Sequence, residues 1–195
     1  MPPASQTPLI LQVLQGLFWL FAIGGAIFAV YKHFAESAER RVWEKAKLAK
    51  QMLGDLDANP KALAATYMLG AWTGRRYARD GVDIAYGFEV TQAQVIGVLD
   101  VARSPQTRNE QYVRECFDNL LFHVELCCAS AERDLVEWSE LQPMLATLLV
   151  GMSRSTLAPL VMYAQYSCYF RAAARLPVLL EAALTKPAAK KYALA

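Results

Sequence analysis

The stretch LFWLFAIGGAIFAVYKHFAESAERR, from Leu17 to Arg41, changes from uninterrupted apolar residues to closely spaced charges just after Tyr31. Together with the residues before it, the 23 positions from Leu9 to Tyr31 contain no Asp, Glu, Lys or Arg. A helix of that length spans about 35 Å, enough to cross the hydrocarbon core of a bilayer with some tilt. We therefore predict a transmembrane helix over residues 9–31.

Two other interpretations of this stretch fit less well. The core helix of a soluble protein is rarely apolar on all sides. A cleavable signal peptide needs a basic start and a small-residue cleavage site, yet residues 1–8, MPPASQTP, contain no Lys or Arg and AVYKHFAE is a poor cleavage context. The sequence favours a permanent anchor.

Basic residues follow the predicted span closely, and none precedes it. They are Lys32, Arg40, Arg41, Lys45, Lys47 and Lys50. The positive-inside rule then places the C-terminal part in the cytoplasm and the short N-terminus on the opposite side of the membrane. Lys32, Arg40, Arg41 and Lys45 are candidates to contact lipid headgroups. A solvated helix face, partly neutralised by interspersed glutamates, is the alternative.

Small residues form a stripe along one face of the predicted span. Ala22, Gly25, Ala26 and Ala29 follow the spacing i, i+3, i+4, i+7, which allows another helix to approach closely. A contact with a partner helix in the membrane is one interpretation. The other is the general abundance of Gly and Ala in membrane helices.

The rest of the chain predicts an all-α fold. Residues 32–58 continue the anchor as a basic juxtamembrane helix and linker, residues 59–185 form a cytosolic helical bundle, and 186–195 are a basic tail. No strand pattern is evident. The apolar runs 145–150 and 157–170 are too short and too interrupted by Gly151 and Arg154 for a second span.

Helix starts in this bundle can be predicted from N-cap residues. Asn59 precedes Pro60 at the start of a helix that runs towards Arg79, where Asp80-Gly81 forms a turn. Capping-box spacing occurs at three places: Thr91 with Gln94, Thr107 with Glu110, and Ser139 with Gln142. Ser155 is expected to cap one long helix over 156–175 that Pro177 ends.

Little in the sequence predicts catalysis. A formal net charge of +2 argues against a nucleic-acid partner, and no glycine-rich phosphate loop is present. Arg75, Arg76 and Arg79 form a basic cluster, which either binds phosphate or lipid headgroups or complements the dipole at a helix end.

The four cysteines lie in apolar helical contexts without the spacing of a disulfide framework, which favours a reducing compartment. Cys116, His123 and Cys127 share one helical stripe, and Cys168 on a later helix could complete a tetrahedral zinc site. No C-x-x-C turn is present, so the sequence favours a buried seam of thiols with one hydrogen-bonded histidine.

One segment resembles a known group of proteins. Residues 119–165, NLLFHVELCCASAERDLVEWSELQPMLATLLVGMSRSTLAPLVMYAQ, resemble the helix, acidic turn, short helix and long helix of an uncharacterised bacterial family of N-terminally anchored single-pass membrane proteins. The resemblance implies a bacterial cytoplasmic membrane and a small all-helical cytosolic domain. It assigns no functional residues.

These observations favour a non-enzymatic accessory or scaffold subunit without a cofactor. Its expected partners are membrane lipid and either an integral membrane protein or a second copy of the chain, bound through the transmembrane helix. The alternatives are a metal-dependent sensor or enzyme at the Cys/His cluster and a membrane-tethered stress or defence effector.

Overall fold

The computed structural model describes residues 9–70, 75–78 and 87–185. Within these residues the fold is all-α, as predicted: seven helices and one pair of two-residue strands. The chain divides between Glu44 and Lys45 into two units. The predicted N-terminal segment 1–8 and the tail 186–195 lie outside the described residues.

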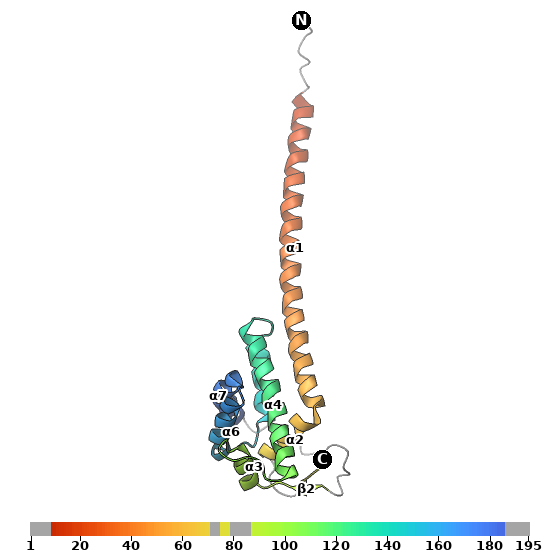
Figure 1. Ribbon diagram of the computed structural model, residues 1–195. Helices are drawn as coiled ribbons and strands as arrows, with labels where there is room; N and C mark the ends of the chain where they lie inside the picture. Colours follow the sequence, from red (N-terminus) through yellow and green to blue (C-terminus); the bar gives the residue numbers. More distant parts are fainter. Residues whose placement is uncertain (1–8, 71–74, 79–86, 186–195) are drawn as a thin grey trace, which may run out of the picture. The chain divides into compact units, whose positions relative to one another are not determined.

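Helix α1 (Leu9–Ala58) runs without a break through both the predicted span and the juxtamembrane segment (Figure 1). No Gly or Pro occurs from Ala26 to Leu53, so nothing in this stretch weakens the backbone hydrogen bonds. The last turns of α1 belong to the second unit, where they bury Ala49, Met52, Leu53 and Leu56. The second unit therefore begins inside the segment that we assigned to a linker.

Helix α2 (Pro60–Gly70) starts as predicted. The side-chain oxygen of Asn59 accepts hydrogen bonds from the backbone N–H groups of Lys61 and Ala62, both at 3.0 Å. The prediction that this helix runs towards Arg79 is wrong, because α2 ends at Gly70.

A short antiparallel pair of strands follows α2, contrary to the expectation of no strand. Strand β1 (Arg76–Tyr77) pairs with β2 (Phe88–Glu89), with Arg76 opposite Glu89 and Tyr77 opposite Phe88. Two-residue strands are too short to produce a visible alternation of apolar and polar residues. The predicted Asp80-Gly81 turn lies outside the described residues.

Two of the three predicted capping boxes are confirmed. Thr91 caps α3 (Gln92–Leu99) together with Gln94, and Thr107 caps α4 (Arg108–Glu132) together with Glu110. In each box the threonine hydroxyl accepts a hydrogen bond from the backbone N–H of the residue three positions later. The side chain of that later residue in turn accepts a hydrogen bond from the backbone N–H of the threonine. Such boxes depend on local spacing, which explains why the sequence reveals them.

The capping box at Ser139 is wrong. Helix α5 (Trp138–Leu148) begins two residues earlier than predicted, with Glu137 at the N-cap and no side-chain cap. The carboxylate of Glu137 instead accepts a hydrogen bond from Lys45 at 2.9 Å, and the Trp138 ring lies 4.9 Å from the Arg175 guanidinium. Tertiary contacts therefore fix this helix start.

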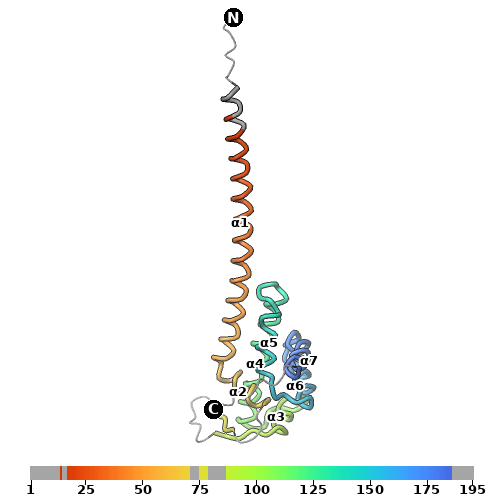
Figure 2. The backbone as a smooth tube through the Cα atoms, turned by 180° about the vertical axis from the view of Figure 1, so that it is seen from behind, coloured from red at the N-terminus to blue at the C-terminus, as the bar shows by residue number. Residues whose placement is uncertain are grey.

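The single long helix predicted over 156–175 is also wrong. The chain forms α6 (Arg154–Tyr166), with Ser153 at the N-cap, and α7 (Phe170–Thr185), which lie side by side (Figures 1 and 2). Pro177 does not end a helix but lies inside α7. The buried residues Leu176, Leu179 and Leu180 hold α7 against the core on either side of this proline.

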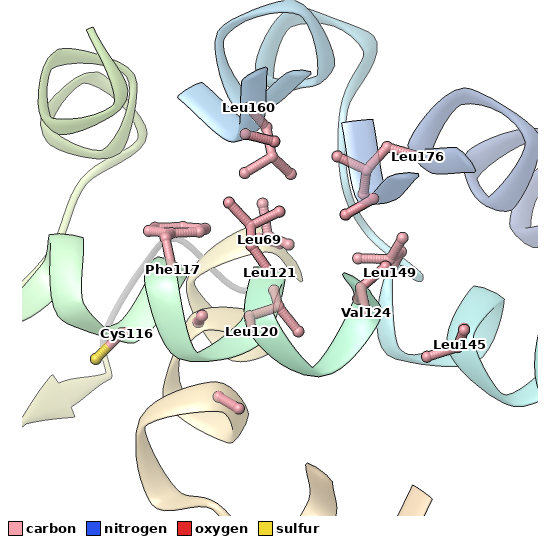
Figure 3. Close-up of a cluster of buried hydrophobic side chains, with 14 of the residues drawn as sticks. Leu69, Cys116, Phe117, Leu120, Leu121, Val124, Leu145, Leu149, Leu160 and Leu176 are labelled. Carbon is pink, nitrogen blue, oxygen red and sulfur yellow. The ribbon is translucent and has the colours of Figure 1, made fainter. Parts of the chain in front are cut away.

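The core of the second unit surrounds α4 (Figure 3). Leu160 of α6 and Leu176 of α7 point toward the leucines of α4, and Leu145 and Leu149 approach from α5 and the turn after it. The fully buried residues of α4 are Cys116, Phe117, Leu120, Leu121, Val124 and Cys127. Burial of each large apolar side chain contributes about 1.5–3 kcal/mol.

One close backbone approach requires glycine. Gly151 has φ of +99°, and a Cβ atom placed there would lie 2.7 Å from the Cα of Gly70. Both the conformation and the space therefore exclude a side chain at Gly151. This contact joins the end of α2 to the turn after α5.

Candidate functional site

The apolar part of α1 is the most unusual surface of the described chain. Among the described residues, α1 is the one helix long and apolar enough to cross a membrane, and none of its most apolar window is buried. The exposed large side chains in the first unit are Leu14, Leu17, Phe18, Trp19, Leu20, Phe21, Ile23, Ile27, Phe28, Val30, Tyr31, Phe34, Val42 and Trp43. So large an apolar surface is costly in water and is compatible with a bilayer around it.

The small-residue stripe lies on this exposed helix. Ala22, Gly25, Ala26 and Ala29 are all exposed, and a Cβ atom added at Gly25 meets no other atom within 4 Å. Gly24, on another face of the helix, has equally free surroundings. Within the first unit, no other described residue therefore covers the stripe.

The candidate headgroup residues have different surroundings. Lys32 pairs with Glu36 at 3.7 Å, Arg40 with Glu44 at 2.9 Å, and the Arg41 guanidinium donates to the Ser37 carbonyl at 3.4 Å. All three side chains are exposed on the helix surface. Exposed pairs of this kind are weak, so these basic groups remain available to anionic headgroups.

Lys45 differs from these three because it belongs to the second unit, where two carboxylates bind its ammonium. It donates hydrogen bonds to the carboxylates of Asp134 and Glu137, and its side chain is only 22% exposed. The bond to Asp134, followed by that to Glu137, raises the pKa of Lys45. A lipid headgroup at Lys45 would have to compete with both carboxylates.

The structure does not gather the four candidate zinc ligands. Cys116 and Cys127 are buried within the second unit, whereas Cys168 is exposed in the turn between α6 and α7. Burial raises the pKa of the Cys127 thiol to about 11, so the thiol is protonated at neutral pH. Among the described residues no group of three or more His, Cys, Asp or Glu could hold a metal ion.

His123 forms a hydrogen bond with Asn59, the residue directly before α2. Its Nε2 atom lies 3.3 Å from the side-chain nitrogen of Asn59, which also donates to Asn119 at 3.1 Å. Burial lowers the pKa of His123, so at neutral pH its imidazole is neutral and Nε2 can accept the Asn59 hydrogen bond. This arrangement matches the hydrogen-bonded histidine that the sequence favoured over a ligand.

A polar contact that the sequence did not reveal joins α4 and α6. The hydroxyl of buried Tyr163 donates to Asp118 at 2.7 Å, and the Arg114 guanidinium lies 5.4 Å from the Tyr163 ring. Arg114 also donates to the carbonyls of Val98, Asp100 and Arg103, which holds the end of α3. Burial raises the pKa of Asp118, while the bond from Tyr163 opposes that rise. Nothing in the spacing of these residues predicts their proximity.

An apolar pocket opens between α3 and α6. It has a volume of about 370 Å³ and is lined by Ile96, Gly97, Leu99, Asp100, Val101, Ala158, Pro159 and Met162. Asp100 is the one ionisable residue in its wall. Such a pocket can accept an apolar side chain of another protein.

The basic cluster does not lie at a helix end. Arg75 precedes β1 and Arg76 lies within it, well beyond the end of α2 at Gly70, so the interpretation as a complement to the helix dipole is wrong for both. Arg75 and Arg76 instead line a pocket beside α2. Arg79 lies outside the described residues.

Comparisons with family models, with curated proteins and with solved structures found no match. The resemblance of residues 119–165 to an anchored bacterial family therefore stays a prediction.

Proposed function

We propose that this protein is a membrane-anchored accessory or scaffold subunit without enzymatic activity. The observation that carries the proposal is the continuity of α1: one helix presents a fully exposed apolar segment and then contributes four buried residues to a helical domain. A chain built in this way tethers the domain to the bilayer without a separate linker. The domain is then available to brace or recruit a larger membrane assembly.

The proposed orientation places the N-terminus outside a bacterial cytoplasmic membrane and the helical domain in the cytosol. Support comes from the basic residues that follow the span, of which Lys32, Arg40 and Arg41 stand exposed on α1. Positive residues next to a span are retained on the cytoplasmic side.

The proposed contact in the membrane is the stripe of Ala22, Gly25, Ala26 and Ala29. Its lack of side-chain bulk allows a partner helix to approach the α1 backbone, which strengthens van der Waals packing between the helices. A partner protein or a second copy of α1 would fit this face. On the cytosolic side, the apolar pocket between α3 and α6 offers a second contact.

Replacement of Gly25 by Leu tests the membrane contact. Gly25→Leu raises the hydrophobicity of α1, so membrane insertion should be unaffected, but the added bulk should separate the two helices. We expect the Kd for the partner to rise at least tenfold, which corresponds to about 1.4 kcal/mol, so that less partner co-purifies in mild detergent. Native mass measurement of the extracted complex distinguishes a second copy from a different protein.

Gly24→Leu is the matched control. It adds the same side chain one residue away, outside the stripe, where the space is also free. We expect it to leave co-purification unchanged. If both variants retained the partner equally, the proposed contact at Gly25 would be contradicted. If the wild-type protein were extracted only as a monomer, the proposed scaffold function would be contradicted.

A further inference from the structure

The pocket beside α2 combines a basic rim with an apolar wall. It has a volume of about 400 Å³, and its lining residues are Pro60, Leu63, Ala64, Tyr67, Arg75, Arg76 and Tyr77. The first four come from α2, and the last three come from β1 and the residue before it. Its volume falls within the range of small-molecule sites.

Arg75 is held in a defined orientation in this pocket. Its guanidinium carbon lies 3.7 Å from the centre of the Tyr67 ring, which is close enough for a stacked cation–π contact. A stacked guanidinium keeps its N–H donors at its edge, where they can bind an oxyanion in a bidentate manner. Within the described part of the chain, no carboxylate forms an ion pair with Arg75.

Tyr77 adds an independent observation at the same pocket. Its side chain is 7% exposed, and its hydroxyl is the one buried side-chain polar atom without a hydrogen-bond partner among the described residues. A buried hydroxyl without a hydrogen-bond partner is unfavourable and often marks a place for a water, ion or ligand. Burial raises the pKa of Tyr77 and the charge of Arg75 opposes that rise, so the two groups interact electrostatically.

The remaining wall of the pocket is apolar. Pro60, Leu63 and Ala64 contribute only carbon atoms from their side chains, and the Tyr67 ring extends this surface toward Arg75. An inorganic anion would leave this wall without a contact. A molecule with both an anionic and an apolar part would use the whole pocket.

We propose that this pocket binds an amphipathic phosphate compound, in which a phosphomonoester pairs with Arg75 and an apolar group rests on Leu63, Ala64 and Tyr67. The phosphate oxygens accept hydrogen bonds from the guanidinium edge. The Tyr67 ring holds the guanidinium in place and contacts the apolar group of the ligand. This site is independent of the proposed membrane partner.

Phenyl phosphate is a suitable probe because it combines both parts and forms no micelles. Isothermal titration of the full chain in a neutral detergent, with detergent alone as the blank, should show saturable binding of one molecule per chain. Inorganic phosphate and phenol each supply only one part of the ligand and should bind at least tenfold more weakly.

Variants of the pocket test the assignment of residues. Arg75→Gln should weaken phenyl phosphate binding at least tenfold, because a charge-assisted bidentate contact is lost. Tyr67→Leu keeps the apolar surface but removes the stack, so it should weaken binding by about two- to fivefold. Arg108→Gln, at an exposed position at the start of α4, removes the same charge elsewhere and should bind like the wild type.

Two results would overturn the proposal: no saturable binding of phenyl phosphate at millimolar concentration, or wild-type affinity in Arg75→Gln. Nanodiscs with and without phosphatidic acid identify the source of the phosphate. Weaker phenyl phosphate binding in the presence of phosphatidic acid would support the site and assign it to a lipid headgroup. Unchanged binding would support it as a site for a soluble ligand.

Discussion

Two residues with left-handed backbone conformations end helices in the second unit. Asp134 has φ of 57° after α4, and Cys168 has φ of 66° after α6. In each case the next N–H bonds to a carbonyl five residues back, from Leu135 to Ser130 and from Tyr169 to Ala164. This is the Schellman arrangement, in which glycine usually occupies the left-handed position. The sequence did not reveal these helix ends because neither position is a glycine.

Cys168→Gly should stabilise the fold by about 1 kcal/mol, because a left-handed conformation costs a residue with a Cβ roughly 1–2 kcal/mol and glycine recovers part of this. The Cys168 side chain is exposed, so little packing is lost. Urea unfolding of the full chain in detergent, followed by circular dichroism, measures the change. If Cys168 were instead a structural zinc ligand, the same variant would lose stability and bound zinc.

The buried contact between Asp118 and Tyr163 predicts a pH dependence. Burial raises the native pKa of Asp118, so its contribution to stability is fully present below the unfolded pKa of about 3.9 and is lost as pH rises through the native value. Asp118→Asn cannot ionise and still offers an oxygen to the Tyr163 hydroxyl. Relative to the wild type, this variant should therefore gain stability as pH rises from about 4 towards neutrality.

The measurement is the difference in unfolding free energy between the two proteins at several pH values, in which other titrating groups cancel. Asp57→Asn, at an exposed position, controls for removal of a carboxylate. A difference that stays constant with pH would show that the environment of Asp118 does not raise its pKa.

At the scale of elements, α7 depends on a side chain from α4. The carboxylate of Glu125 accepts a hydrogen bond from the backbone N–H of Ala172 at 2.8 Å and another from the Arg171 guanidinium, also at 2.8 Å. It thereby satisfies one of the free N–H groups in the first turn of α7. Because the capping residue lies 47 positions before the helix residue that it binds, no local sequence pattern predicts this cap.

Glu125→Ala should destabilise the domain by about 1–2 kcal/mol, the usual effect of removing a helix cap. Glu132→Ala is the matched control, since Glu132 binds the same arginine at 2.6 Å but does not cap the helix. The exposed ion pair between Glu132 and Arg171 should contribute no more than about 1 kcal/mol to stability. Equal losses in the two variants, measured by urea unfolding, would show that the cap does not stabilise α7.

Helix boundaries show which elements the sequence could predict. Thr91 and Thr107 each form a capping box with the residue three positions later, so local spacing was sufficient to predict these two helix starts. Ser139 has the same spacing but lies within α5, because Trp138 and Glu137 have partners elsewhere in the fold. Pro177 misled the prediction in a similar way, since the burial of neighbouring leucines outweighs the backbone hydrogen bond that proline removes.

For the whole molecule, the all-α class and the apolar N-terminal helix could be predicted because both follow from long, periodic patterns. The pocket beside α2 could not. It requires the Arg75 guanidinium to lie over the Tyr67 ring, and this proximity is a property of the tertiary structure. The sequence did draw attention to Arg75 and Arg76 as a basic cluster, but it did not reveal the apolar wall beside them.

The topology of the whole chain can be tested with reporters fused to its C-terminal end. If the basic residues after the span determine orientation, a reporter that is active only in the cytosol should be active when fused after Ala195. A reporter that is active only outside the membrane should be inactive at the same position. Replacement of Lys32, Arg40 and Arg41 by Gln should shift activity towards the outside reporter, because these three exposed residues are expected to favour retention in the cytosol. Activity of the outside reporter in the wild-type chain would reverse the proposed orientation. The helical domain, with its pocket beside α2 and its four cysteines, would then meet extracytoplasmic partners.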